Sequence, residues 1–137
     1  RGDQRMSFEP ALVQELKTIS ALENRIYPLT APEATASGGV PYLIYSSSEG
    51  LRDKTLGGHL ESKEVRAELN IIAKKYSDMK AITKQVIALL ITFEGRQIGT
   101  GGPFIEELTY QMPVEMYESE PALYRCVVEF SAYLRGD

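Results

Sequence analysis

The stretch FIEELTYQMPVEMYESEPALYRCVVEFSAYL, residues 104–134, alternates apolar and polar side chains along two successive runs. Successive side chains of a β-strand point to opposite faces, so each run is predicted to be a strand with one apolar face. Together the two runs predict an antiparallel hairpin that is buried on one side and wet on the other. The expected inner face consists of Phe104, Leu108, Tyr110, Met112, Val114 and Met116 in the first run, and of Tyr124, Cys126, Val128, Phe130, Ala132 and Leu134 in the second.

The N-terminal third predicts one helix, one loop and one strand. Apolar residues recur at helical spacing between residues 8 and 22, and Ser7 is placed to cap this helix. The small and polar stretch 30–39 is expected to be a surface loop. The aromatic and branched run Tyr42–Tyr45 then predicts a strand. A long loop over residues 46–61 should follow, and we expect it to reach neighbouring components.

The middle of the chain predicts a third amphipathic strand and a second helix. Val65, Ala67, Leu69, Ile71 and Ala73 alternate with Arg66, Glu68 and Asn70. Ser77 is expected to cap the helix that follows, and Gly95 lies where a left-handed residue ends a helix. The Gly-rich segment 95–103 is expected to be a flexible turn, because it lacks the Lys and Ser/Thr of a phosphate-binding loop. We also expect this segment to reach neighbouring components, since long mobile loops often become ordered on assembly.

These elements predict an α+β fold of order αββαββ, with two helices packed on one face of a four-stranded antiparallel sheet. The opposite face should meet water or another subunit. Pro113 has no N–H to donate, so its strand is expected to be bulged there or to lie at a sheet edge. The side chains expected on the open face are those of Arg66, Glu68, Glu107, Glu115, Arg125 and Glu129.

Length and composition predict one domain over residues 6–134. Residues 1–5 precede Met6 and are interpreted as a remnant of an expression vector. The chain of 137 residues has 15 Lys and Arg against 19 Asp and Glu, a formal net charge of -4, which argues against gripping nucleic acid by its phosphates. A single cysteine, no signal-peptide pattern and no membrane-length apolar run lead us to expect a soluble, intracellular protein.

The sequence offers few candidate catalytic or metal-binding residues. His59 is the only histidine and lies in the Gly-rich loop, and Cys126 falls on the expected inner face of a strand. Glu106 and Glu107 are adjacent and should point to opposite faces of a strand, so they cannot act as an acid and base pair. We therefore predict no catalytic, metal-binding or cofactor-binding residues and no enzyme activity.

Basic charge concentrates at Lys74, Lys75, Lys80 and Lys84. Two interpretations stay open. The first is a solvated face, and the second is a docking patch for the Glu-rich C-terminal region of a neighbouring copy.

Two short segments, Arg25–Pro28 and Pro41–Ile44, together with the order of elements around them, resemble the tail-completion proteins of long-tailed bacteriophages, also called tail terminators or head–tail joining proteins. The resemblance implies a phage or prophage virion protein that assembles in the host bacterial cytoplasm. It implies a ring, commonly of six subunits, that caps the tail tube, stops its growth and contacts the head connector or stopper, while DNA passes through the central hole.

The resemblance brings no catalytic residue with it, so the contact residues are a hypothesis drawn from charge and position. A small oligomeric ligand-binding or regulatory module is the alternative. The residues expected to contact other subunits or partners are Arg52, Asp53, Lys54, Arg66, Glu68, Lys74, Lys75, Glu107 and Glu115.

Overall fold

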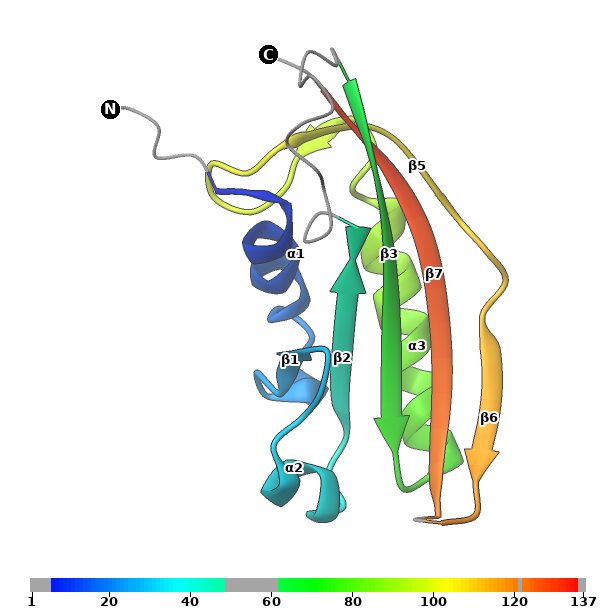
Figure 1. Cartoon of the computed structure of the whole chain (residues 1–137). Coiled ribbons are helices and arrows are strands. Elements are labelled where there is room, and N and C mark those ends of the chain that lie inside the picture. Colours follow the sequence, from blue (N-terminus) through cyan, green and yellow to red (C-terminus); the bar gives the residue numbers. More distant parts are fainter. Residues whose placement is uncertain (1–5, 49–61, 121, 136–137) are drawn as a thin grey trace.

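A computed structural model describes residues 6–48, 62–120 and 122–135 of the chain (Figure 1). Its helical elements are α1 (Phe8–Leu16), the short 3₁₀ helix η1 (Ser20–Leu22), α2 (Glu33–Ser37) and α3 (Tyr76–Ile91). Its strands are β1 (Ile26–Pro28), β2 (Tyr42–Ser47), β3 (Ser62–Ala73), β4 (Arg96–Gln97), β5 (Phe104–Tyr110), β6 (Val114–Glu118) and β7 (Leu123–Arg135).

The predicted four-stranded antiparallel sheet with two helices is wrong. All seven strands belong to one mixed sheet of order β1-β2-β3-β7-β5-β4, and β6 pairs with β7 beside β5. The pairing of β1 with β2 is parallel and every other pairing is antiparallel. The additional elements β1, α2 and β4 have three, five and two residues, which is too short to leave a periodic pattern in the sequence.

The central pair of strands is β3 and β7, which stay in register from Ser62 opposite Arg135 to Ala73 opposite Tyr124. Their alternating side chains divide between the two faces as the sequence predicts. The fully or almost fully buried side chains on the inner face are Val65, Ala67, Leu69, Ile71 and Ala73 of β3 and Cys126, Val128, Phe130, Ala132 and Leu134 of β7.

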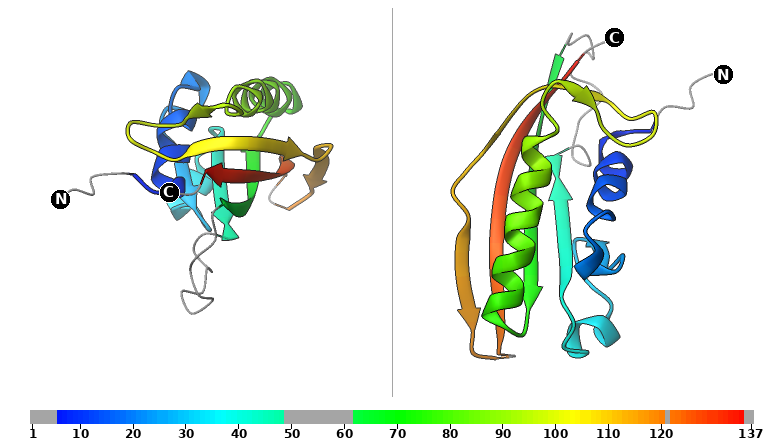
Figure 2. Two further views of the ribbon diagram at one scale, coloured as in Figure 1. Left: turned by 90° about the horizontal axis from the view of Figure 1, so that it is seen from above. Right: turned by 180° about the vertical axis from the view of Figure 1, so that it is seen from behind.

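Helices α1 and α3 cover this inner face, as the view from behind shows (Figure 2). Phe8, Leu12 and Leu16 of α1 are completely buried, and so are Met79, Val86 and Leu90 of α3. A smaller apolar cluster of Tyr42, Ile72 and Leu123 lies apart from this main core, with residues of β1 and α2 packed against it. The helix spacing predicted for both long helices is therefore confirmed, although α1 ends at Leu16 and the chain continues through a separate 3₁₀ turn.

The inner face predicted for residues 104–116 is mostly wrong, because two extra residues shift the phase of the alternation. The β5–β7 register shifts between Ile105 and Glu107, so Ile105 is buried where Phe104 was expected. Tyr110 pairs with Phe130, and Val114 pairs with Val127. Between these two pairs the chain advances four residues along the β5–β6 edge but only three along β7, so the edge has one extra residue. A one-residue slip moves every following side chain to the other face.

The second shift coincides with Pro113, between β5 and β6 at the sheet edge, as the missing N–H predicts. Because of it, Glu115 pairs with the inward-facing Cys126 and lies on the helix side of the sheet, not on the open face. Tyr110, Met112, Val114 and Met116 are exposed instead of buried.

Two helix ends also differ from expectation. α3 begins at Tyr76 after an extended Lys75, so Ser77 lies inside the first turn and caps nothing. Ser7 does precede α1, but its side chain makes no capping hydrogen bond. Gly95 has a φ of +83°, the left-handed conformation predicted for it.

The Gly-rich segment after α3 is fastened to α1. Two carboxylate oxygens of Glu15 accept hydrogen bonds from the Arg96 guanidinium at 3.0 Å each, and one of them also accepts the Gly99 N–H at 2.7 Å. Gly102 is buried, and a Cβ at this position would lie 2.1 Å from the Ile98 carbonyl oxygen. The flexible turn predicted here is therefore a fixed connection between the first helix and the sheet.

This fastening should make stability depend on the charge of Glu15. The Arg96 hydrogen bonds hold the pKa of the Glu15 carboxyl below its ordinary value of 4.5. Its contribution is thus complete above pH 4.5 and is lost as the pH falls through the lowered pKa. At pH 7 we expect Glu15→Gln to lower the free energy of unfolding by about 1–2 kcal/mol in denaturant titrations. The difference in the free energy of unfolding from wild type should shrink below pH 4.5.

Glu94→Gln, at an exposed turn position, is the control. If Glu15→Gln lowers the free energy of unfolding by the same amount at pH 7 and pH 3, the charge of Glu15 does not fasten this segment.

Candidate interaction surfaces

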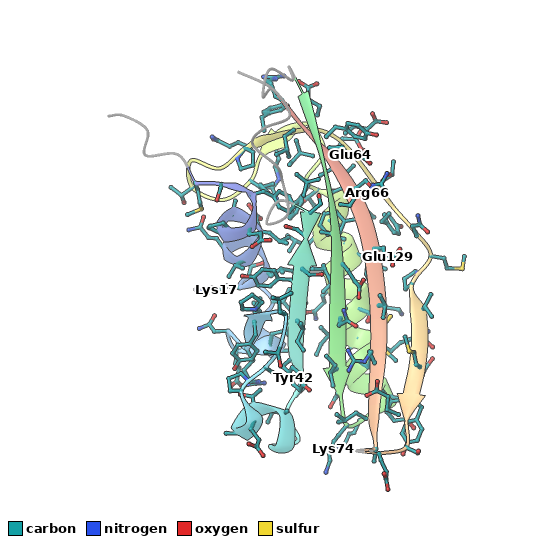
Figure 3. The ribbon with its side chains drawn as sticks, in the orientation of Figure 1. Lys17, Tyr42, Glu64, Arg66, Lys74 and Glu129 are labelled. Atoms are coloured by element: carbon teal, nitrogen blue, oxygen red, sulfur yellow. The ribbon has the colours of Figure 1, made fainter. Side chains whose placement is uncertain are left out.

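The face of the sheet opposite α1 and α3 carries charged side chains (Figure 3). Glu64, Arg66 and Glu129 all project from this open face, on the side away from α3. The central alternation of β3 and β7 places them there, because their neighbours in the sequence are the buried residues of the inner face. The open face predicted for Arg66 and Glu129 is therefore confirmed.

A row of carboxylates crosses the middle of this face. Glu68 is the register partner of Glu129 on β7, and Ser46 of β2 is its partner on the other side. Like charges directly opposite one another on neighbouring strands destabilise a sheet. Arg66 lies two residues before Glu68 on the same face of β3, and its closest acidic contact is with Glu64, at 3.4 Å. Acidic side chains therefore outnumber basic ones here.

Further along the same face, the charges form a connected chain of hydrogen bonds. Arg125 donates to Glu118 at 3.1 Å and to the Asn70 side-chain oxygen at 3.0 Å. Asn70 in turn donates from its amide nitrogen to Glu68 at 2.9 Å. This chain links β6, β7 and β3 across the sheet and fixes one of the two carboxylates of the central row.

A groove of about 1120 Å³ runs over this open face. Pro28 and Leu29 line it on the β1 side, and Tyr110 and Met112 line it on the β5 side. Arg66, Glu68 and Glu129 are also among its lining residues. The groove thus combines charged groups with exposed apolar groups.

Glu115, expected on the open face, lies in a different cluster. Its carboxylate accepts hydrogen bonds from Lys80 at 2.6 Å and from the Tyr76 hydroxyl at 2.9 Å, both from α3. The Lys80 hydrogen bond, followed by that of Tyr76, lowers the pKa of Glu115, and the same contacts raise the pKa of Lys80. These groups satisfy one another within the chain.

The basic patch is divided between two places. Lys80 is engaged with Glu115, whereas Lys74 and Lys75 lie at the turn between β3 and α3, both exposed. Within the described part of the chain, no acidic group pairs with Lys74 or Lys75. Lys74 reaches the lower end of the sheet in Figure 3. The side chain of Lys74 passes close to the turn at Gly39, where its Cδ atom lies 3.4 Å from the position that a Cβ on Gly39 would occupy.

The remaining predicted contact residues are dispersed. Glu107 lies on β5, exposed, opposite Tyr133 and at the other end of the sheet from the Lys74–Lys75 turn. Arg52, Asp53 and Lys54 lie outside the described residues, as do His59 and most of the predicted loop over residues 46–61.

Cys126 is a free and completely buried thiol. Burial raises its pKa, which disfavours the thiolate form that a nucleophile needs. Over residues 6–48, 62–120 and 122–135, no group of three or more His, Cys, Asp or Glu side chains is placed to hold a metal ion. In the same ranges, no helix has both the length and the apolarity needed to cross a membrane.

The sequence reasoning missed the exposed apolar side chains around β6. The exposed fraction of Met112 is 85%, that of Val114 is 56% and that of Tyr117 is 55%. Met112 and Val114 alternate with polar residues in the pattern of a core strand, so these two were expected to be buried, whereas Tyr117 was not among the residues expected on the inner face. Pro113 was the signal that could have identified an edge with a shifted phase.

The fold and these surfaces define a class: a helix-backed mixed sheet that presents a charged open face and a bare strand edge. The family model described as Tail completion protein gp17 matches residues 10–135, and the chain therefore belongs to this family of tail completion proteins. The resemblance drawn from Arg25–Pro28 and Pro41–Ile44 is confirmed. The protein has a structural role in the tail of a phage-type particle.

A solved structure shares this fold. A chain from the virion of a native gene transfer agent particle superposes with a TM-score of 0.61 over 93% of each chain, at 17% sequence identity. At this identity the likeness supports the fold alone. No curated protein matches the chain.

The row of opposed carboxylates gives a test of the open face. We expect Glu129→Gln to raise the melting temperature by about 1–2 °C, because it removes a like charge opposite Glu68. The gain should shrink when salt screens the pair. Thermal unfolding followed by circular dichroism at low and high salt measures both effects. Glu94→Gln is the matched control, and a Glu129→Gln variant less stable than that control would show that the row is not repulsive.

Proposed function

We propose that this protein forms a ring, of six subunits, that caps the tail tube, stops its polymerisation and joins it to the head connector or stopper. The match to the tail completion family over residues 10–135 is the observation that carries the proposal. The gene transfer agent likeness supports it, because that chain comes from an assembled virion. Assembly takes place in the host bacterial cytoplasm, and the protein ends in the virion.

Two physical features support the ring. The formal net charge of -4 suits a passage through which DNA must slide without binding. The carboxylates on the open face add to this, since neither Glu68 nor Glu129 takes part in an ion pair within the described part of the chain. The protein works by shape and self-association, and its partners are further copies, the major tail tube protein and the connector.

The groove over the open face is the observation that favours the alternative, a small ligand-binding or regulatory module. Ligand pockets are usually enclosed and mostly apolar. Here the lining includes Glu68 and Glu129, and over residues 6–48, 62–120 and 122–135 no cationic side chain pairs with either carboxylate. The groove also follows the sheet from β2 to β5. An open, charged surface fits this arrangement better than a small-molecule site does.

The first test is the assembly state. Native mass spectrometry of the protein alone, and with purified tail tubes, should show a closed ring, and tube ends blocked by it should no longer elongate. A protein that remains monomeric under both conditions and does not arrest tube growth would overturn the proposal.

A charge reversal tests the electrostatic contact between neighbours. Lys75 lies beside Lys74 at the turn before α3, at the same end of the sheet as the Glu118–Glu120 turn. If these opposite charges meet across subunits, Lys75→Glu should weaken ring formation by about tenfold and added salt should have the same effect. Lys17→Glu, an equal reversal at the end of α1, is the control, with both measured by sedimentation. Equal losses at the two positions would argue against the contact.

A further inference from the structure

Exposed apolar side chains gather along one segment of the chain. In the described part, ten large apolar side chains are exposed, and five of these lie between Tyr110 and Tyr117. A sixth, Tyr76, packs beside them through Tyr124, which contacts both Tyr76 and Tyr117. The side chains of this segment divide between the two faces of the edge, because Val114 and Met116 pair with Val127 and Arg125 of the open face, whereas Tyr117 pairs with Tyr124 on the helix side. Exposed apolar side chains grouped along one edge of a small domain mark an interaction site. The five are Tyr110, Met112, Val114, Met116 and Tyr117.

The backbone of this segment is also available. β4 pairs only with Phe104 and Ile105 of β5, so no described strand pairs with the outer side of residues 106–118. Natural proteins protect long strand edges with charges, prolines or covering elements. Here Pro113 is present, but Met112 beside it has an exposed fraction of 85%.

The opposite edge of the sheet differs in kind. β1 has three residues and ends at Pro28, which has no N–H, and the following Leu29 has a φ of +66°. This edge therefore cannot extend the sheet by backbone pairing. It does expose apolar side chains nearby, because the exposed fractions are 76% for Leu29 and 40% for Val40.

The two sides of the sheet also differ in charge. The Val40 side carries Lys74, whose aliphatic carbons pass the adjacent Gly39. The β6 side ends in the Glu118–Glu120 turn. This turn and the β3–α3 turn that carries Lys74 lie at the same end of the sheet (Figure 1). Glu118 is already paired with Arg125, so the acidic charge that this turn offers to a partner is that of Glu120. An apolar and basic surface thus lies across the sheet from an apolar and acidic one.

We propose that residues 110–117 of one subunit dock on the Leu29 and Val40 side of the next copy, a side-chain contact between two different surfaces. The proposal rests on the proposed ring for the existence of an assembly and adds which surfaces meet. A contact between different surfaces is head-to-tail and continues from subunit to subunit until the ring closes. Because the two charged ends lie at one end of the sheet, neighbouring subunits stand level, which favours closure over a helical filament.

The rival arrangement is two β6 edges paired with each other. This would be an isologous contact and would stop at a dimer. Cross-linking separates the two arrangements, because a head-to-tail contact joins different positions and an isologous contact joins the same position twice.

The experiment uses two single-cysteine variants of the full chain, Leu29→Cys and Met112→Cys, each with a different tag. Buried Cys126 is left in place because its side chain is inaccessible. After mixing and treatment with a short thiol cross-linker, we expect heterodimers that carry both tags. Ile91→Cys, on α3 and 58% exposed, replaces Leu29→Cys as the control and should give none. Cross-linking of Met112→Cys only to itself would overturn the proposal in favour of the isologous pair.

A charged side chain in the same segment should disrupt the same contact. Met112→Lys should reduce assembly at least tenfold in light scattering, with an unchanged melting temperature, since Met112 packs against little in the subunit. Ile91→Lys should assemble normally. If wild type and Met112→Lys assemble equally, this docking surface is wrong while the ring stands. If wild type never assembles, with or without tail tubes, the proposed ring and the docking surface both fail.

Discussion

The antiparallel pairing of β3 with β7 is the constraint on which the rest of the molecule depends. The two strands stay in register from Ser62 to Ala73, and their alternate residues build one fully buried face. A slip of one residue would exchange the core with the charged face, so the alternation fixes the register. β2 is added on one side and the β5–β6 edge on the other, and α1 and α3 both pack on the face that the pairing creates. The charged open face is thus a geometric consequence of the core.

Sequence patterns predicted the elements that are long enough to repeat a period. β3, β7 and α3 contain several alternations or helical turns, and each was located to within a few residues. β1, α2 and β4 have no period of their own, because the chain positions them by pairing and packing with distant residues. The shift at Glu106 left no signal in the sequence, and the missing N–H of Pro113 predicted a bulge or an edge there but not the change of face that follows it. An extra residue on one strand is defined only relative to the strand opposite it.

The same limit explains which parts of the candidate site were found. Arg66 and Glu68 were placed correctly because they lie on β3, where the alternation is uninterrupted. Lys74 and Lys75 were found from charge alone and lie side by side at one turn. Glu115 was assigned to the wrong face because it follows the shift at Pro113, and it is engaged with Lys80 and Tyr76. The exposed residues Met112 and Val114 were interpreted as core for the same reason.

The chain therefore holds two features that do not favour an isolated subunit. The carboxylates of Glu68 and Glu129 face each other across strands, and an apolar edge is left in water. Neither is needed for the core, which is complete on the other face of the sheet. Covering the apolar edge with another copy removes it from water, which is favourable in proportion to the area covered. The acidic row gains nothing from such a contact, because charges that are buried must be paired. Met112 and Glu129 nevertheless line the same groove, so the apolar edge and the acidic row adjoin each other on the open face.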